Sequence, residues 1–444
     1  MGIKSGAPFN AASSELAVSR VAGFPAHRDR AAAIGEVHSR PHPQLPGSRT
    51  VVQLAFVTEG GALVDASVIA ELCRKRGAAP PGQGARYHII PWTEGSLRWE
   101  RHSEFSTYVW DAPYVQVEDW RKRSPFDAGF NPPGAAMCGV RLEIHDWAED
   151  GTAPGFAADP ESLCHSLVED GKASIMTDFR QDPDGLTRVY ILDRGLTDNR
   201  RGALAQRLIE IETYRVFCML GLSLAQSLSA RLKRMEDELA DLTDAIRESG
   251  RKNSEALLAQ LTDLAAELEA QAASSLFRFG ASRAYHEIVL ERLEALKEVP
   301  CVGAESWSQF LTRRIAPAMR TVRSVEERQA NLSRKLSRTT QLLRTWVDVE
   351  VEKQNRNLLA SMNDRARLQL RLQQTVEGLS VAAISYYVVG LASYMLGGLP
   401  TGSGMPAPKQ ILALSVPLVV VMIWLIVRRI RRSHGGEAGS SPGS

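Results

Sequence analysis

The sequence predicts an α+β protein with three parts: an N-terminal mixed α/β cytosolic domain, a long helical coiled-coil and stalk region, and a C-terminal hairpin of two transmembrane helices. Three observations support this fold class. Short β-rich runs and a few amphipathic helices occupy residues 31–195, a nearly unbroken helical pattern occupies residues 196–378, and residues 379–427 contain one charged side chain, Lys409. We expect residues 1–30 and 433–444 to be flexible ends.

Composition narrows the class of protein. The 53 basic and 51 acidic residues leave a formal net charge of +2, so no nucleic-acid partner is expected. Five cysteines, with no Cys-x-x-Cys pair, argue against a disulfide framework and a zinc knuckle. The N-terminus contains no apolar core of a secretory signal. These features together predict reduced thiols in the cytosol.

Alternating apolar and polar residues predict the strands of residues 31–195. The stretch Leu97–Trp110 alternates on both sides of His102, so we expect two strands with a break there, or one bulged strand. Asp65 is the expected N-cap of a helix that ends at Gly77. The other expected elements are strands at Thr50–Val57, Arg86–Trp92 and Val140–Trp147, a short helix at Asp159–Asp170 with Pro160 at its start, and a hairpin of Ala173–Phe179 and Leu186–Asp193 joined by an Asp-Gly turn.

Residues 196–316 are expected to form a helical hairpin region. Apolar residues at spacings of three and four predict a coiled-coil seam from Leu228 to Ile246, which resumes at Leu257 after a break with Ser254 as a cap. A further helix is expected from Ser275 to Glu298.

Residues 317–378 are expected to form a stalk helix that continues into the membrane. Pro317 is well placed at a helix start, and no proline and only one glycine, Gly378, follow it before residue 379. With the first span the helix would run for about 80 residues, roughly 120 Å. Its narrow apolar stripe requires oligomerisation or packing against the preceding hairpin.

Two apolar runs, residues 379–397 and 411–427, predict two transmembrane helices within residues 379–432. A helical hairpin buried in a soluble core is the alternative. Arg365, Arg367 and Arg371 precede the first run and an Arg-rich segment, residues 428–432, follows the second, whereas the connector carries only Lys409. Since cations remain on the cytosolic side, both termini are expected there and the lipid bilayer is an expected partner.

Four stretches carry a resemblance to a known family: "GEVHSRPHPQL", "RWERHSEFSTYVW", "VYILDRGLTDNRRGALAQRLIEIETYRVF" and "AISYYVVGLASY". Through them the chain resembles a bacterial family of predicted membrane-anchored proteins of unknown function. This resemblance implies a location in the bacterial inner membrane and no assigned activity.

From about residue 50 onward the order of elements also resembles the CorA-type magnesium and cobalt channels. That resemblance implies a homo-oligomer, a pentamer in the CorA case, and a divalent cation as the transported or sensed ion. CorA-type channels end the first span with an aromatic residue and Gly-Met-Asn, whereas the matching place here is Tyr394-Met395-Leu396-Gly397. The connector contains no carboxylate, so the oxygen ligands and negative charge of a divalent-cation filter are absent from this segment.

Polar and small residues form one stripe on the first predicted span: Ser380, Tyr387, Gly390 and Tyr394. The stripe suits either the lining of a weakly selective pore or a packing seam between helices. We favour packing, because no ionisable residue marks a pathway.

Two further groups are candidate sites in the cytosolic part. His38 and His42, with His102 and Glu104, could form a metal site or an acid/base pair, although capping and hydrogen bonding explain them more simply. Arg194, Arg200 and Arg201 could bind an anion or contact another subunit. A simpler explanation is that Thr197 or Asp198 caps the helix and that the arginines pair with acids.

The pattern as a whole predicts a membrane protein that moves or senses ions, or else a non-transporting scaffold that presents an interaction domain. No catalytic motif is recognised, so enzymatic activity is not expected. No cofactor is expected apart from a divalent cation.

Overall fold

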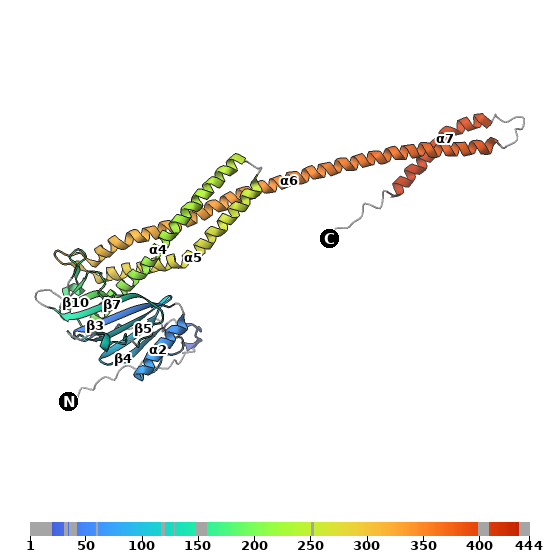
Figure 1. The fold of residues 1–444 in the computed structure, drawn as a ribbon. Coiled ribbons are helices and arrows are strands. Elements are labelled where there is room, and N and C mark those ends of the chain that lie inside the picture. The colour runs from blue at the N-terminus through green and yellow to red at the C-terminus, as the bar shows by residue number, and fades with distance from the viewer. Residues whose placement is uncertain are drawn as a thin grey trace. The chain divides into compact units, whose positions relative to one another are not determined.

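The computed structural model describes residues 20–30, 34, 42–58, 61–116, 120–127, 129–147, 158–249, 253–397 and 408–434. The chain divides into two compact units: residues 1–245 with 259–339, and residues 246–258 with 340–444. His38 and residues 398–407 of the predicted connector lie outside the described residues. Figure 1 shows the elements along the chain.

A nine-stranded mixed sheet forms the α+β part of the first unit, in the order β11-β8-β9-β10-β7-β3-β6-β5-β4. Strands β10 and β7 pair in parallel, and every other pair in the sheet is antiparallel. A separate ribbon joins β1 (Arg20–Val21) and β2 (Phe24–Pro25). The sheet strands are β3 (Arg49–Val57), β4 (Tyr87–Trp92), β5 (Gly95–Arg101), β6 (Phe105–Pro113), β7 (Ala135–Asp146), β8 (Cys164–Val168), β9 (Ala173–Thr177), β10 (Thr187–Asp193) and β11 (Val299–Pro300).

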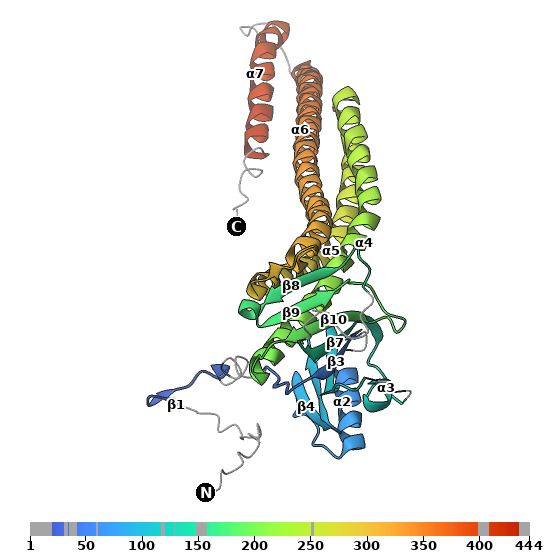
Figure 2. The same ribbon diagram turned by 90° about the vertical axis from the view of Figure 1, so that its left-hand side faces the viewer.

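The described helices of both units are α2 (Ala62–Arg76), α3 (Trp120–Arg123), the single 3-10 turn η1 (Glu169–Gly171), α4 (Asp198–Ser249), α5 (Ser254–Leu296), α6 (Trp307–Gly397) and α7 (Pro408–His434). Helix α4 begins where predicted, because the Thr197 hydroxyl accepts a hydrogen bond from the backbone N–H of Arg200 at 3.4 Å. In Figure 2, α2 lies at the end of the sheet that contains β4, and α4, α5 and α6 run together beyond β8.

The two faces of the sheet bury different clusters. One face packs with α2 around Trp99, Tyr108 and Trp110. The other face packs with α4, α5 and the first part of α6 around Phe105, Phe217 and related residues. Because strand side chains alternate between faces, β5 directs Leu97 and Trp99 to the α2 cluster and Arg98 and Glu100 to the opposite face.

Three helices of the first unit contact one another through polar pairs as well as apolar residues. Arg328 of α6 bonds Glu236 of α4 at 2.8 Å, and Ser333 of α6 donates to Glu269 of α5 at 2.7 Å. The seam residues predicted in this unit are buried, Leu228 to Leu242 on α4 and Leu261 to Leu268 on α5. Gly221 allows α4 to lie close to α5, since a Cβ at this position would meet Ser282 Oγ of α5 at 2.5 Å.

Two predictions about the α/β domain are wrong. Residues Asp159–Asp170 do not form a helix, because Cys164–Val168 is strand β8, which pairs along its length with β9. Pro160 suits the first position of a helix, but it also suits the turn that precedes this strand. Asp65 is not an N-cap either: α2 begins after Gly61, and the buried Asp65 carboxylate accepts a hydrogen bond from the Ser106 hydroxyl at 2.7 Å.

Two helix boundaries also differ from the prediction. No break occurs at Ser275, because α5 is continuous from Ser254 to Leu296. Helix α6 begins at Trp307, so Pro317 lies inside it. The Glu298 carboxylate accepts from the backbone N–H groups of Trp307 and Ser308 at 3.0 and 2.7 Å, and these contacts favour the earlier start.

One helix among the described residues, α6, is long and apolar enough to cross a membrane by length and composition, within Trp307–Met395. Little of its apolar window is buried. The strands predicted at Thr50–Val57, Arg86–Trp92 and Val140–Trp147 are confirmed as β3, β4 and part of β7, and His102 lies at the predicted break between β5 and β6.

Candidate functional site

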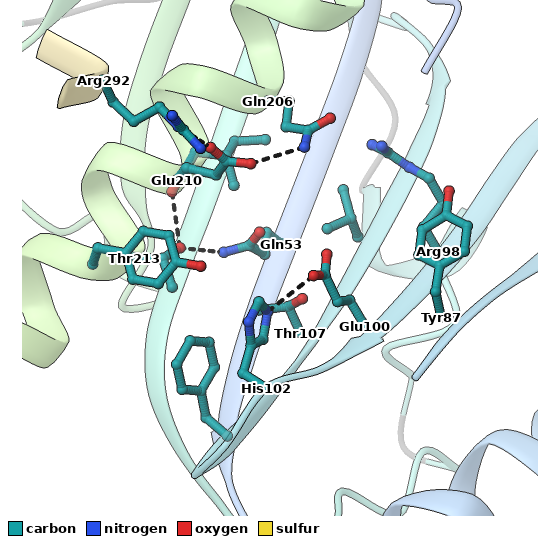
Figure 3. Close-up of a pocket in the computed structure, with 14 residues that line it drawn as sticks. Gln53, Tyr87, Arg98, Glu100, His102, Thr107, Gln206, Glu210, Thr213 and Arg292 are labelled. Carbon is teal, nitrogen blue, oxygen red and sulfur yellow. Dashed lines mark hydrogen bonds and ion pairs between the residues drawn. The ribbon is translucent and has the colours of Figure 1, made fainter. Parts of the chain in front are cut away.

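A polar cavity of about 270 Å³ lies in the first unit, between strands β3 to β6 and helices α4 and α5. Figure 3 shows the residues around it. Polar and aromatic side chains line most of it: Gln53, Tyr87, Arg98, Glu100, His102, Phe105, Thr107, Gln206, Glu210, Thr213, Tyr214 and Arg292.

Strand register and helix spacing bring these side chains together. Tyr87 of β4 lies opposite Glu100 of β5, and Glu100 lies opposite Thr107 of β6, so the three occupy one face. On α4, Gln206, Glu210 and Thr213 are four and three residues apart and therefore share one side of the helix. A polar helix stripe thus lies over a polar patch of the sheet.

Hydrogen bonds order the part of the cavity beside α4. Gln53 donates to the Thr213 hydroxyl, which itself donates to the backbone carbonyl of Ile209 at 2.8 Å. Glu210 accepts from Gln206 Nε2 at 2.8 Å and from Arg292 Nε at 2.6 Å. Arg292 therefore has its counter-charge inside the cavity wall.

An aromatic group closes the other end. The His102 ring stacks on Phe105 with centroids 4.3 Å apart, and Phe105 stacks on Phe217 at 4.0 Å. His102 Nε2 lies 3.9 Å from the Glu100 carboxylate. Glu104, just beyond this group, pairs with both terminal nitrogens of Arg278, at 3.0 and 2.5 Å.

Arg98 and Tyr87 differ from the other polar groups of the cavity. Arg98 Nε and the Tyr87 hydroxyl are buried and have no hydrogen-bond partner among the described residues. Burial lowers the pKa of Arg98, although Tyr87 and nearby carboxylates act in the other direction, and burial raises the pKa of Tyr87. No described carboxylate lies within ion-pair distance of Arg98, whose charge is therefore not compensated by a direct contact.

A second hollow of about 340 Å³ adjoins the first, and Tyr87 and Arg98 line both. His42, Pro43 and Pro46 form its other side. This segment lies directly against α4, since a Cβ at Gly202 would meet the Pro43 carbonyl oxygen at 1.6 Å. His42 Nδ1 consequently lies 3.3 Å from Gln206 Oε1.

The structure separates the residues of the predicted histidine site. His102 lines the cavity, His42 lines the second hollow, and Glu104 forms an ion pair with Arg278. His38 lies outside the described residues. Among the residues that are described, no group of three or more His, Cys, Asp or Glu side chains is gathered as in a metal site.

The three arginines at the start of α4 make intramolecular contacts. Arg194 lies over the Trp147 ring at 3.4 Å, and Arg200 lies 3.6 Å from Glu169. The buried Arg201 donates to Asp193 at 2.7 Å and also to Asp198 and two backbone carbonyls. Arg200 and Arg201 therefore pair with acids of the same chain, whereas Arg194 contacts an aromatic ring.

The predicted stripe on the first span lies on α6 in the second unit. Tyr387 and Tyr394 are 70% and 85% exposed, Gly390 is half-buried, and the exposed Ser380 donates to the carbonyl of Val376 at 2.9 Å. Exposure of this kind is compatible with a pore lining, with a packing seam, and with lipid.

Sequence reasoning found His102 but missed the rest of the cavity. The signal for Arg98 and Glu100 was present, because they alternate with Leu97 and Trp99. The signal for Gln206, Glu210 and Thr213 was their spacing of four and three residues, which places them on one side of α4. Neither pattern shows that the polar face of the strand and the polar side of the helix lie opposite each other.

The sequence of the chain identifies the protein family to which it belongs. The sequence matches the family described as "Protein of unknown function (DUF3422)" over residues 25–434. The chain belongs to this family. No curated protein matches the DUF3422 chain.

A solved structure, the CorA magnesium transporter from Methanocaldococcus jannaschii, shows a weak similarity to this DUF3422 chain. The two sequences are 11% identical, and the match covers 77% of this chain and 99% of the transporter, with a TM-score of 0.15. At this TM-score the similarity supports no functional conclusion.

Proposed function

We propose that this DUF3422 protein is an integral protein of the bacterial inner membrane whose cytosolic α+β unit senses a small solute in the polar cavity. The observation that carries the proposal is the exposure of apolar side chains in the two C-terminal helices. They include Leu379, Tyr386 and Leu391 on α6, and Leu418, Val421 and Leu425 on α7. Such surfaces are stable in lipid and costly in water.

In this proposal residues 379–397 and 411–427 cross the membrane as a hairpin, and both chain ends are cytosolic. Arginines before the first run and after the second favour that orientation. Arg428 lies over the Trp424 ring at 4.9 Å, which suits an aromatic residue and a cation at the lipid–water interface.

Self-association is part of the proposal. Leu358, Leu359, Met362, Leu368 and Leu372 are exposed on α6 ahead of the first proposed span. A second copy of the same helix would cover this stripe. The proposal assigns no enzymatic activity and no nucleic-acid partner.

Topology reporters test the membrane part. A green fluorescent protein fused after Ser444 should fluoresce, because the fusion stays in the cytosol. The same reporter inserted after Gly404, in the connector, should not. Fluorescence from both positions, or from neither, would contradict the hairpin. Chemical crosslinking of the full chain in membranes would show the subunit number.

A second candidate function is ion conduction by the assembled spans. The exposed hydroxyl groups of Tyr387 and Tyr394 on one stripe favour it. The double variant Tyr387→Ala, Tyr394→Ala should then change magnesium flux into liposomes while assembly is retained. Unchanged flux would leave the sensor, or the alternative of a non-transporting scaffold.

A further inference from the structure

We propose that the cavity binds the anionic group of a small solute, a carboxylate or a phosphate, through the Arg98 guanidinium and the Tyr87 hydroxyl. The inference rests on the proposed function and names the class of solute that the cavity would sense.

Among the described residues, Arg98 is the cavity arginine that no carboxylate pairs with directly. Arg292 is paired with Glu210 at 2.6 Å, whereas Glu100 lies 3.9 Å from the His102 ring, which is a cation only when protonated. Asp111, in the second hollow, is paired with the buried Arg49 and accepts from the Ser96 hydroxyl at 2.6 Å. Glu210 and Asp111 are thus already paired with other arginines, and Arg98 has no carboxylate of the described residues at ion-pair distance.

Comparison with other arginines supports the assignment. Among the described residues Arg49, Arg98 and Arg141 each have a buried Nε without a partner. Arg49 is paired with Asp111 and Arg141 with Glu143 through another nitrogen, whereas Arg98 has no described carboxylate within reach. Neutral groups such as Trp99 Nε1 also lack partners, but they carry no charge. Arg98 is half-buried with its Nε enclosed; an unpaired cation that is partly removed from water is costly, and an anion would offset that cost.

The geometry suits a compact anion. A guanidinium presents a planar fork of donors that matches carboxylate and phosphate oxygens, and a tyrosine hydroxyl can add one donor. Arg98 and Tyr87 lie on adjacent strands and line both hollows. The volume of about 270 Å³ admits a small solute rather than a macromolecule.

Thermal unfolding of the full chain in detergent micelles tests the inference, with inorganic phosphate and citrate as separate probes at constant ionic strength. Phosphate and citrate also stabilise proteins non-specifically. The shift in Tm is therefore compared with that of Arg98→Met and of the control Arg74→Gln, which alters an exposed side chain on α2. Wild type and Arg74→Gln should shift alike, and Arg98→Met should lose about tenfold or more in apparent affinity.

Tyr87→Phe provides a second variant that keeps the ring and removes only the hydroxyl. It should fold with an unchanged or higher Tm in the absence of probe and should weaken the response to the same anion. Which of the two probes acts on wild type distinguishes a phosphate from a carboxylate ligand. A weaker response to the anion in both Arg98→Met and Tyr87→Phe would support the inference.

Equal shifts in wild type and Arg98→Met, or no shift with either anion, would overturn the inference. So would a shift with spermidine but not with phosphate or citrate, which would mean that the cavity binds a cation. That last result would leave the proposed sensor function intact. Anion binding at Arg98 in a chain whose topology reporters contradict the hairpin would instead overturn the membrane proposal alone.

Discussion

The two faces of the nine-stranded sheet serve different purposes at the β4–β6 end. On the α2 face, Trp99, Tyr108 and Trp110 are almost fully buried and form a closed cluster. On the opposite face the same strands place Arg98, Glu100 and Thr107 around a cavity beneath α4. Neighbouring residues of β5 therefore contribute to stability on one side and to a candidate binding site on the other. Substitutions on the α2 face should therefore affect folding, and substitutions on the cavity face should affect binding.

The largest effect is expected from Trp99→Ala on the α2 face. Trp99 is 1% exposed, so its truncation leaves a large void, and the free energy of unfolding should fall by about 4 kcal/mol. Denaturant unfolding followed by circular dichroism measures this loss. Ile89→Ala, at a partly exposed position of β4, should cost far less. A loss below about 1 kcal/mol for Trp99→Ala would show that this face is not a closed core.

Asp111→Asn should have the next largest effect, on the cavity face. Arg49 and Asp111 are both buried and paired, so neutralising the acid leaves an uncompensated buried cation and should cost about 3 kcal/mol. The same unfolding measurement applies. Adding Arg49→Met should recover part of the loss, because the double variant no longer leaves Arg49 without its counter-charge. No recovery would mean that packing, rather than charge, accounts for the loss.

A smaller, pH-dependent effect is expected from His165 of β8, toward the other end of the sheet. Burial lowers the pKa of His165 below its usual 6.5, and its ring lies 2.7 Å from the Ser174 hydroxyl. Between the folded pKa and 6.5 the unfolded chain binds more protons than the folded one, so stability should fall as pH decreases through that window.

The comparison of His165→Asn with wild type isolates this contribution. The variant should lose stability less steeply when pH is lowered from about 7 to 5, as measured by Tm at each pH. His286 also has a pKa lowered by burial, so part of the wild-type slope should remain. Identical slopes in the two proteins would contradict the assignment.

The smallest change in stability is expected from Tyr87→Phe. The Tyr87 hydroxyl is buried without a described partner, so its removal should leave the free energy of unfolding unchanged or raise it by up to about 1 kcal/mol. Parallel unfolding curves of the two proteins without added anion would measure this. A clear loss of stability would mean that the hydroxyl makes a structural bond, and the contrast between the two faces would weaken.

Local patterns were sufficient for the elements whose own residues determine them. Alternation around His102 predicted β5 and β6, and Thr197 predicted the start of α4, since both signals act over a few residues. Asp159–Asp170 was assigned wrongly because a proline followed by mixed residues suits a helix and a turn equally. The pairing of Cys164–Val168 with β9 makes this part of the segment a strand. The start of α6 depended on the Glu298 carboxylate, outside the helix itself.

The candidate site was predictable only in fragments. The sequence shows that Arg98 and Glu100 share a strand face and that Gln206 and Glu210 share a helix side. It does not show that these surfaces meet, because β5 and α4 are far apart along the chain. That Arg98 has no acid beside it among the described residues likewise depends on three-dimensional neighbours, since the similar arginines at positions 49 and 141 have acids beside them.

The α+β class, the long helices and the apolar character of residues 379–427 could be predicted from the sequence, because they follow from composition and from periodicity along the chain. Tertiary structure decided which strand face α4 covers, which buried charges are paired, and where a cavity remains. The physical reason is that hydrogen bonds and ion pairs act over a few ångströms, and only folding brings distant residues that close.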